Sequence, residues 1–293
     1  MIVGFIGLGI MGAPIAANLV KAGFDVVGYN RSRAKVDALA AQGGRAAGSV
    51  AAAVRDADVV ITMLPDSPDV EAVALGDDGI FAHAKQGVLY IDMSTIRPDV
   101  AARIAAAGKE RGIRVLDAPV SGGELGAIEA SLSIMVGGEP ADFEAAKPVL
   151  DAVGKTVVHV GPAGSGQTVK AANQLIVAGN IELLAEALVF LEAYNVDTES
   201  AVLVLGGGLA GSAVIDRKAA GMLKRDFKPG FRLELHHKDL GIVQSAARAA
   251  DVVTPLGALV AQLVAAMVAR GDGGLDHSGL LKLVEDLSGR KSG

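Results

Sequence analysis

The sequence predicts an α/β protein whose N-terminal part forms a doubly wound, mainly parallel sheet and whose C-terminal part is all-α. Three observations predict this fold. Short apolar runs alternate with helical segments through the first half, a glycine-rich turn follows the first run, and a long apolar stretch without proline opens the second half. We place the boundary in the glycine-rich segment Gly161–Gly166, which divides the chain into residues 1–163 and 164–293.

Most of the expected strands are apolar throughout rather than alternating, as in a sheet covered on both faces. They are Ile2–Ile6, Asp25–Tyr29, Val59–Met63, Val88–Asp92, Arg114–Leu116, Leu132–Val136 and Thr156–Val160. Helices are expected between them, over Ala13–Ala22, Ser32–Ala41, Pro98–Arg111 and Pro140–Val153. Strands and helices that alternate in this way are typical of a parallel sheet.

The second half begins with a helix that we expect over Gln167–Tyr194, because this stretch has no proline and the single glycine Gly179. At 1.5 Å per residue this helix is about 40 Å long. It carries few charges and must be covered on most sides, so we expect part of it to pack against another subunit in a homodimer or homotetramer. Further helices are expected over Thr198–Leu205, Ala213–Ala219, Leu240–Ala249, Leu256–Ala269 and Ser278–Leu287.

Composition excludes several classes of protein. The 293 residues are 51% apolar and 20% charged, with a net charge of −6, and they contain no cysteine. Disulfides, thiolate catalysis and cysteine-ligated metals are therefore excluded, and no basic cluster indicates a nucleic-acid partner. The apolar start lacks a positive segment, and the uncharged run Val252–Ala269 contains Pro255 and Gly257, so we expect neither a signal peptide nor a membrane span. A soluble cytoplasmic protein fits.

A glycine-rich turn directly follows the first expected strand and opens a helix; its residues are Gly7, Leu8, Gly9, Ile10, Met11 and Gly12. In a dinucleotide-binding turn the first glycine makes the tight turn, the second admits the pyrophosphate, and the third lets helix and strand pack closely. The helix N-terminus supplies N–H groups for the phosphates. The pattern alone is weak, but its place between two expected strands predicts a Rossmann-type domain that binds NAD(P).

The end of the second expected strand indicates which cofactor is bound. NAD enzymes usually place Asp or Glu there to bind the ribose 2′-hydroxyl. This chain has Asn30, Arg31 and Ser32, with Lys35 one helical turn further on. A carboxylate that would repel a phosphate is missing and an arginine is present, so NADP(H) is preferred and NAD(H) is possible. Alternatively, Arg31 and Lys35 are solvated surface charges.

Ligands of doubly wound sheets bind at the carboxyl ends of the strands. Leu64, Pro65 and Thr95 occupy that position in this chain and are expected near the cofactor. Thr95 would donate to the nicotinamide ribose or to the substrate. It would equally serve as the N-cap of the helix that follows.

Lys170 and Asn173 lie three residues apart on the long apolar helix and so share one of its faces. A buried lysine is uncommon because the charge is costly to remove from water. A cleft beside a bound dinucleotide would give this lysine a purpose, which is to deliver a proton while the cofactor delivers a hydride. Alternatively, Lys170 extends to the surface along the helix.

Taken together, these segments resemble the β-hydroxyacid dehydrogenases over nearly the whole chain. The matching segments are Gly4–Gly12, Asp92–Thr95, Asp117–Gly123, Gly166–Gln174 and Lys238–Leu240. A single one of these matches can arise by chance, but five matches in this order are specific to the family. Within the family, Gly206–Ala219 and Phe227–Lys238 are most similar to the branch that reduces tartronate semialdehyde (2-hydroxy-3-oxopropionate).

The resemblance also implies roles for individual residues. Lys170 is the expected proton donor to the developing oxyanion, and Asn173 orients the same oxygen or the lysine. Ser121, Gly122 and Gly123 are expected to bind the substrate carboxylate through a nest of N–H groups; a plain structural turn is the alternative. Lys238 is expected to contact the substrate or the nicotinamide end of the cofactor, although it would otherwise be an ordinary surface lysine.

The expected function is an NAD(P)H-dependent reduction of tartronate semialdehyde to glycerate, which requires no metal. Enzymatic alternatives are a 3-hydroxyisobutyrate dehydrogenase and a succinic or glyoxylic semialdehyde reductase. The non-enzymatic alternative is a nucleotide-binding pseudo-dehydrogenase, which the presence of both Lys170 and Asn173 disfavours.

Overall fold

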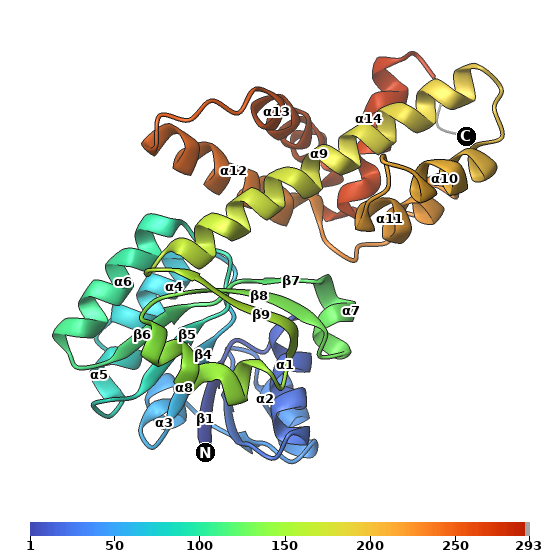
Figure 1. Ribbon diagram of the computed structural model, residues 1–293. Coiled ribbons are helices and arrows are strands. Elements are labelled where there is room, and N and C mark those ends of the chain that lie inside the picture. Colours follow the sequence, from blue (N-terminus) through green and yellow to red (C-terminus); the bar gives the residue numbers. More distant parts are fainter. Residues whose placement is uncertain (291–293) are drawn as a thin grey trace. The chain divides into compact units, whose positions relative to one another are not determined.

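The strands of the N-terminal half form one sheet with β1 near its middle (Figure 1). A computed structural model describes residues 1–290. Within them the sheet has nine strands, in the order β3-β2-β1-β4-β5-β6-β8-β7, with β9 paired to β8. The strands are β1 (Ile2–Ile6), β2 (Asp25–Tyr29), β3 (Arg45–Ala46), β4 (Val59–Thr62), β5 (Leu89–Asp92), β6 (Arg114–Asp117), β7 (Val120–Ser121), β8 (Leu132–Gly137) and β9 (Gly154–Gly161).

The sheet is mainly parallel, which confirms the predicted fold class. The first six strands in this order, from β3 through β2, β1, β4 and β5 to β6, are parallel to one another. Strand β8 runs antiparallel to β6 and β7 and parallel to β9. From β1 the chain passes to β2 on one side and later to β4 on the other. This reversal is the switch point at which doubly wound sheets bind their ligands.

Helices cover both faces of the sheet and explain the apolar strands. Along β1, Val3 and Phe5 belong to one core and Ile6 belongs to the other. The first core is closed by α1 (Gly12–Lys21), α2 (Arg33–Ala41), α7 (Gly123–Ile128) and α8 (Pro140–Leu150). The second is closed by α3 (Val50–Val54), α4 (Ser67–Leu75), α5 (Ile80–His83) and α6 (Pro98–Glu110).

Several short elements were not predicted from the sequence. Strands β3 and β7 have two residues each, and helices α3, α4, α5 and α7 have four to nine. Elements of this length carry too few residues for a periodic pattern, so tertiary packing decides whether they form. A local signal did exist for two of them, because Ser49 and Asp66 cap α3 and α4 through their side chains.

The structure divides into two compact units, of which the first ends at Lys170 and the second begins at Ala171. Helix α9 (Ser165–Ala193) starts in the first unit and continues through the second (Figure 1). Up to residue 290 no strand follows β9. The other helices are α10 (Thr198–Gly207), α11 (Ala213–Leu223), α12 (Leu233–Ala249), α13 (Pro255–Ala269) and α14 (Leu280–Leu287), with short 3-10 turns at Asp272–Gly274 and His277–Gly279.

Helix α12 begins about two turns before the expected Leu240. Its first two turns were missed because polar residues occupy buried positions there, so the sequence shows no apolar periodicity. These buried polar residues are His236 and Asp239. The added turns carry Lys238, which therefore lies on a regular helix.

Helix α9 is long and apolar enough to cross a membrane by length and composition alone, and 50% of its most apolar window is buried within the structure. Its buried residues Ala178 and Ile181 belong to a core shared with α12, α13 and α14. The apolar character of α9 is thus explained in large part by its place as the central helix of the second unit.

Candidate active site

The glycine-rich turn after β1 has the geometry of a dinucleotide-binding turn. Gly7 has a φ of 101°, and its N–H donates to the carbonyl of Tyr29 at 3.0 Å. A Cβ on Gly12 would collide with the carbonyl oxygen of Gly7, whereas a Cβ on Gly9 would meet nothing within 4 Å. Gly7 and Gly12 are thus required by the backbone itself, and Gly9 faces open space where a pyrophosphate can approach.

The N-terminus of α1 is free to bind an anion. Its N-cap residue Met11 makes no side-chain capping bond, and the first turn has no acidic residue. The neighbouring Ile10 is exposed and Leu8 is buried. Uncapped N–H groups and the positive end of the helix dipole fit the phosphates of a nicotinamide dinucleotide.

The residues predicted to contact the ribose follow β2 and lie next to the glycine turn. Asn30 accepts the N–H of Leu8 at 3.1 Å and so ties the end of β2 to the glycine turn. Arg31, Ser32 and Lys35 are exposed. Within residues 1–290, neither Arg31 nor Lys35 forms an ion pair, in contrast to Arg33, which pairs with Asp37. Two cationic side chains without an ion-pair partner among the described residues, at the end of β2, would suit the 2′-phosphate of NADP(H).

A polar network links the loops after β4 and β5. The hydroxyl of Ser94 accepts the N–H of Leu64 at 2.9 Å, and the N–H of Ser94 donates to Asp92 Oδ1 at 3.2 Å. Thr62 donates to the same oxygen at 2.7 Å. The loop with Leu64 and the exposed Pro65 is therefore fastened to the loop that carries Thr95.

Thr95 is half-buried and does not cap the following helix. The N-cap of α6 is Arg97, with Pro98 as first helical residue. The capping alternative for Thr95 is therefore wrong, because Pro98 at the first helical position moves the helix start two residues further along. Thr95 remains a candidate for contact with cofactor or substrate.

Asp117 and Gln167 anchor the start of α9 to the carboxyl edge of the sheet. The Asp117 carboxylate accepts the N–H of Gly164 at 2.7 Å and the N–H of Gln167 at 2.9 Å. The amide of Gln167 donates to the carbonyl of Ser94 at 2.8 Å and accepts the N–H of Ile96 at 3.0 Å. Lys170 follows one turn later and is only 7% exposed.

Two buried carboxyl groups lie behind these loops. Burial raises the pKa of Asp92 to about 6, and its Oδ2 has no hydrogen-bond partner among the described residues. Burial also raises the pKa of Asp117, although the N–H groups of Gly164 and Gln167 oppose this effect.

The predicted carboxylate-binding turn lies between β7 and α7. Ser121 ends the strand, and Gly122 and Gly123 have positive φ values of 140° and 65°. A Cβ on Gly123 would meet nothing within 4 Å, so this turn borders open space. Asn18 of α1 donates to the carbonyl of Ala127 at 2.8 Å and thereby ties α7 to the helix that follows the glycine turn.

In the second unit, a chain of hydrogen bonds connects the other two predicted site residues. Asn173 donates to Gln174 Oε1 at 2.8 Å, and Gln174 donates to Asp239 Oδ2 at 2.6 Å. Lys238 forms an ion pair with Asp239 Oδ1 at 2.8 Å. Asn173 on α9 and Lys238 on α12 are therefore linked through the buried side chains of Gln174 and Asp239.

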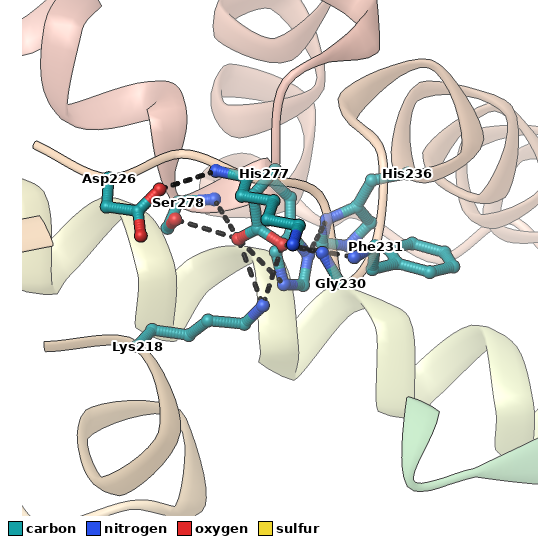
Figure 2. Close-up of polar contacts among 9 residues, drawn as sticks. Lys218, Asp226, Gly230, Phe231, His236, His277 and Ser278 are labelled. Atoms are coloured by element: carbon teal, nitrogen blue, oxygen red, sulfur yellow. Dashed lines mark hydrogen bonds and ion pairs between the residues drawn. The ribbon is translucent and has the colours of Figure 1, made fainter. Parts of the chain in front are cut away.

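A second polar cluster, around Asp276 and His277, adjoins these hydrogen-bonded residues through the carbonyl of Gln174 (Figure 2). His277 Nδ1 is 3.0 Å from His236 Nδ1, and His236 Nε2 is 3.3 Å from the carbonyl of Gln174. The Asp276 carboxylate binds Lys218 at 2.9 Å and accepts N–H groups from Gly230, Phe231 and Ser278. Burial raises the pKa of Asp276, but the charge of protonated His277, the Lys218 ammonium and the backbone N–H donors together lower it to about 2. The same cluster cross-links the start of α12, helix α11 and the turn before α14.

Across residues 1–290 no group of three or more His, Asp or Glu side chains is arranged to hold a metal ion.

Sequence reasoning identified the segments of this site but missed the residues that join them. Six polar side chains each connect parts of the chain that are far apart in sequence. They are Asn18, Asp92, Ser94, Asp117, Gln167 and Asp239. All of them except Asn18 stand inside the segments that match the family, so their presence there was the available signal.

Comparison with known proteins identifies the family. Residues 2–161 match the family described as NAD binding domain of 6-phosphogluconate dehydrogenase, and residues 164–284 match NAD-binding of NADP-dependent 3-hydroxyisobutyrate dehydrogenase. The 2-hydroxy-3-oxopropionate reductase of Escherichia coli (strain K12) is 40% identical over 291 residues, which are 99% of each chain. The chain belongs to the β-hydroxyacid dehydrogenase family. It is therefore an oxidoreductase that uses a nicotinamide cofactor.

Other members of the β-hydroxyacid dehydrogenase family are similar over the same length. The NAD-dependent L-serine dehydrogenase of Pseudomonas aeruginosa is 39% identical and covers 98% of this chain and 99% of its own. The structure of Mycobacterium tuberculosis 3-hydroxyisobutyrate dehydrogenase with L-serine has a TM-score of 0.88 at 35% identity, covering 97% and 98%. Psf3 in complex with NADP⁺ and 2-OPP also has a TM-score of 0.88, at 29% identity, covering 96% and 99%.

Proposed function

We propose that this protein reduces a small carboxylated aldehyde with NADPH, and that its substrate is tartronate semialdehyde, which it converts to glycerate. The proposal is supported by 40% identity to a reductase of this compound over the whole chain. It is also supported by two uncommitted cations, Arg31 and Lys35, after β2, where a 2′-phosphate would lie. NADH is the alternative cofactor.

One observation carries the chemistry: Lys170 is a buried lysine on the first turns of a helix that Asp117 and Gln167 anchor to the ligand-binding edge of the sheet. An ammonium group buried at this edge of the sheet is explained if it faces the carbonyl group of a bound substrate. We propose that the Lys170 ammonium donates its proton to the substrate oxygen as negative charge develops there. In the reverse direction, neutral Lys170 removes the hydroxyl proton.

The other predicted residues bind and orient. The N–H groups of Ser121, Gly122 and Gly123 hold the substrate carboxylate, and Asn173 orients the carbonyl oxygen or the lysine. The glycine turn binds the dinucleotide, which supplies the hydride when bound, and Thr95 and Lys238 contact the cofactor or the substrate. Residues 1–163 thus serve the cofactor, and residues 164–293 serve the substrate and subunit association.

We further propose a cytoplasmic homodimer or homotetramer. The helical unit exposes apolar side chains of α9 and α10 that a second copy would cover. The cytoplasm holds the NADPH pool that the reaction needs.

A second candidate reaction is favoured by the similarity to an L-serine dehydrogenase, which is nearly as high as that to the reductase. Glycerate, L-serine and 3-hydroxyisobutyrate share a carboxylate and a C3 hydroxyl and differ at C2, which carries a hydroxyl, an ammonium or a methyl group. The group that the protein accepts at C2 therefore distinguishes the two reactions.

The test is a substrate panel followed at 340 nm. Reduction is measured with tartronate, methylmalonate and succinic semialdehydes, and oxidation with glycerate, L-serine and 3-hydroxyisobutyrate. We expect the highest kcat/KM with tartronate semialdehyde and NADPH. A higher value for L-serine with NAD⁺ selects the second candidate. Binding of NADPH without turnover of any compound identifies a pseudo-dehydrogenase.

Replacement of Lys170 by alanine tests the proton donor. We expect Lys170→Ala to lower kcat by about 10²–10⁴-fold, the usual contribution of a general acid. NADPH affinity, measured by fluorescence titration, should stay within about threefold because binding of the dinucleotide depends mainly on the glycine turn. Turnover near the wild-type value would exclude Lys170 from the chemistry.

A further inference from the structure

We propose that Gln167 is a positioning residue whose side-chain amide holds Lys170 and Thr95 in a fixed relation. This inference rests on the proposed role of Lys170. All the contacts that support it lie within the first unit. Gln167 belongs to the first turn of α9, and Lys170 follows at i+3 on the same side of the helix.

The amide of Gln167 brackets Thr95 from both sides. Its Nε2 donates to the carbonyl of Ser94 at 2.8 Å, and its Oε1 accepts the N–H of Ile96 at 3.0 Å. These are the backbone groups on either side of Thr95. With 1% of its surface exposed, Gln167 makes both bonds out of contact with solvent. Water therefore cannot replace either partner without rearrangement of the loop.

The contact demands both a donor and an acceptor at the end of a side chain with three carbon atoms. A methionine has a similar length, but it has no donor and its thioether sulfur is only a weak acceptor. An ionised glutamate accepts from Ile96 but places a second acceptor against the carbonyl of Ser94. Glutamine is thus matched chemically to this pair of backbone groups.

The tie extends to the loop after β4. The hydroxyl of Ser94 accepts the N–H of Leu64 at 2.9 Å, so the loop that Gln167 holds also holds Leu64. Three segments predicted to contact the ligands, those of Leu64, Thr95 and Lys170, are therefore joined through the Gln167 amide and the Ser94 hydroxyl. Reactions of this kind lose rate when catalytic groups are displaced by about 1 Å.

Loss of the Gln167 amide should affect the reaction more than the fold. The start of α9 has a second anchor, since the Asp117 carboxylate accepts the backbone N–H groups of Gly164 and Gln167. These bonds do not involve the Gln167 side chain, so the helix keeps its N-terminal cap in a variant. The loop of Thr95 loses its connection to Lys170.

The first test is Gln167→Met. We expect kcat with the best substrate to fall about 10–100-fold, as for a small displacement of a catalytic group, while the Kd for NADPH stays within about threefold. Val149→Ala in α8 is the control for stability, because Val149 is fully buried in a core of the same unit away from these loops. It should lower the Tm and leave kcat unchanged. A kcat for Gln167→Met within twofold of wild type overturns the proposal.

The second test is Gln167→Glu, which separates positioning from simple loss of stability. Burial favours the neutral carboxyl group, whose O–H can donate to the carbonyl of Ser94. We expect kcat relative to wild type to rise as the pH is lowered from 8 to 5.5, because the protonated side chain restores both bonds. A ratio that stays constant and at least tenfold below one over this range overturns the proposal.

Lys170→Ala and an exchange measurement distinguish this proposal from the proposed function. Amide hydrogen exchange of Ile96 needs no turnover, and we expect it to be at least tenfold faster in Gln167→Met and unchanged in Lys170→Ala. Fast exchange in Gln167→Met together with full activity in Lys170→Ala would leave the tie intact and reject the role of the lysine. Unchanged exchange of Ile96 in Gln167→Met would reject the tie itself.

Discussion

Asp92 is a buried carboxyl group whose environment opposes its charge. Its Oδ1 accepts hydrogen bonds from Thr62 and Ser94, but burial outweighs them and raises its pKa from 3.8 to about 6. Because the folded pKa lies above the unfolded value, Asp92 contributes stability below about pH 4 that is lost as the pH rises through 6. A pKa difference of about 2 corresponds to about 3 kcal/mol.

We predict that Asp92→Asn becomes more stabilising relative to wild type as the pH rises. Between pH 4 and 7 the difference in the free energy of unfolding should change by about 2–3 kcal/mol in favour of the variant. Urea unfolding at each pH measures it. The exposed Asp77→Asn serves as control and should show a small, pH-independent difference. A pH-independent difference for Asp92→Asn as well would contradict the raised pKa of Asp92.

Arg31 and Lys35 are predicted to set the preference for NADPH. The double substitution Arg31→Ala, Lys35→Ala should raise the KM for NADPH by about 100-fold or more, since each charge-assisted bond to a phosphate contributes about 1.5–3 kcal/mol. The KM for NADH should change less than twofold. Arg33→Ala is the matched control because Arg33 already pairs with Asp37. Equal losses for both cofactors would place the two cations outside the ribose site.

At the scale of elements, the start of α12 is held by the histidine pair. Both rings can stay neutral when His236 Nε2 donates to the carbonyl of Gln174 and His277 Nδ1 donates to His236 Nδ1. Burial lowers the pKa of His277 well below its usual value, and the nearby His236 and Lys218 lower it further while Asp276 opposes them. A second proton on His277 is therefore disfavoured in the folded protein.

This arrangement predicts that acid weakens the helical unit. His277 has a depressed folded pKa, so its contribution is present above about pH 6.5 and falls by about 1.4 kcal/mol per pH unit below it. His277→Asn keeps an N–H near the Nδ1 position and cannot be protonated, so it should lose less stability between pH 7 and 5. Urea unfolding followed by circular dichroism measures this loss. His237→Asn, on the exposed face of α12, should behave like wild type. An acid sensitivity equal to wild type in His277→Asn would refute this account.

At the scale of the whole molecule, an unpartnered apolar surface predicts association. Ile176, Leu183 and Phe190 recur every seven residues on α9, and each is more than half exposed. No residue of α10 is buried, although the helix is mostly apolar, and Leu203 is 79% exposed. Apolar surface of this kind is stabilised by burial against another chain.

We expect the 29.6 kDa chain to sediment as a dimer or tetramer. Phe190→Glu and Leu203→Glu should each shift it toward smaller species, because a carboxylate would be buried without a partner. Analytical ultracentrifugation measures the distribution. Ala38→Glu, at an exposed position of α2, is the control. A wild-type protein that sediments as a monomer at micromolar concentration would contradict the prediction.

The sequence by itself determined the fold class, because apolar runs of strand length and a glycine turn are local patterns that leave few alternatives. It also identified the family, through five short motifs in order. It predicted the long helix to within two residues at its start and one at its end. The short elements β3, β7 and α7 and the first turns of α12 were missed, since their formation depends on packing rather than on local periodicity.

Only the tertiary structure decided which side chains meet. Gln167 binds backbone groups more than 70 residues away, and Asp117 caps a helix that begins nearly 50 residues later. His236 and His277 are 41 residues apart. Hydrogen bonds need donor and acceptor within about 3 Å, and a linear pattern of residue types contains no such distances. The motifs therefore identify the segments of the candidate site, and the folded structure determines which hydrogen bonds connect them.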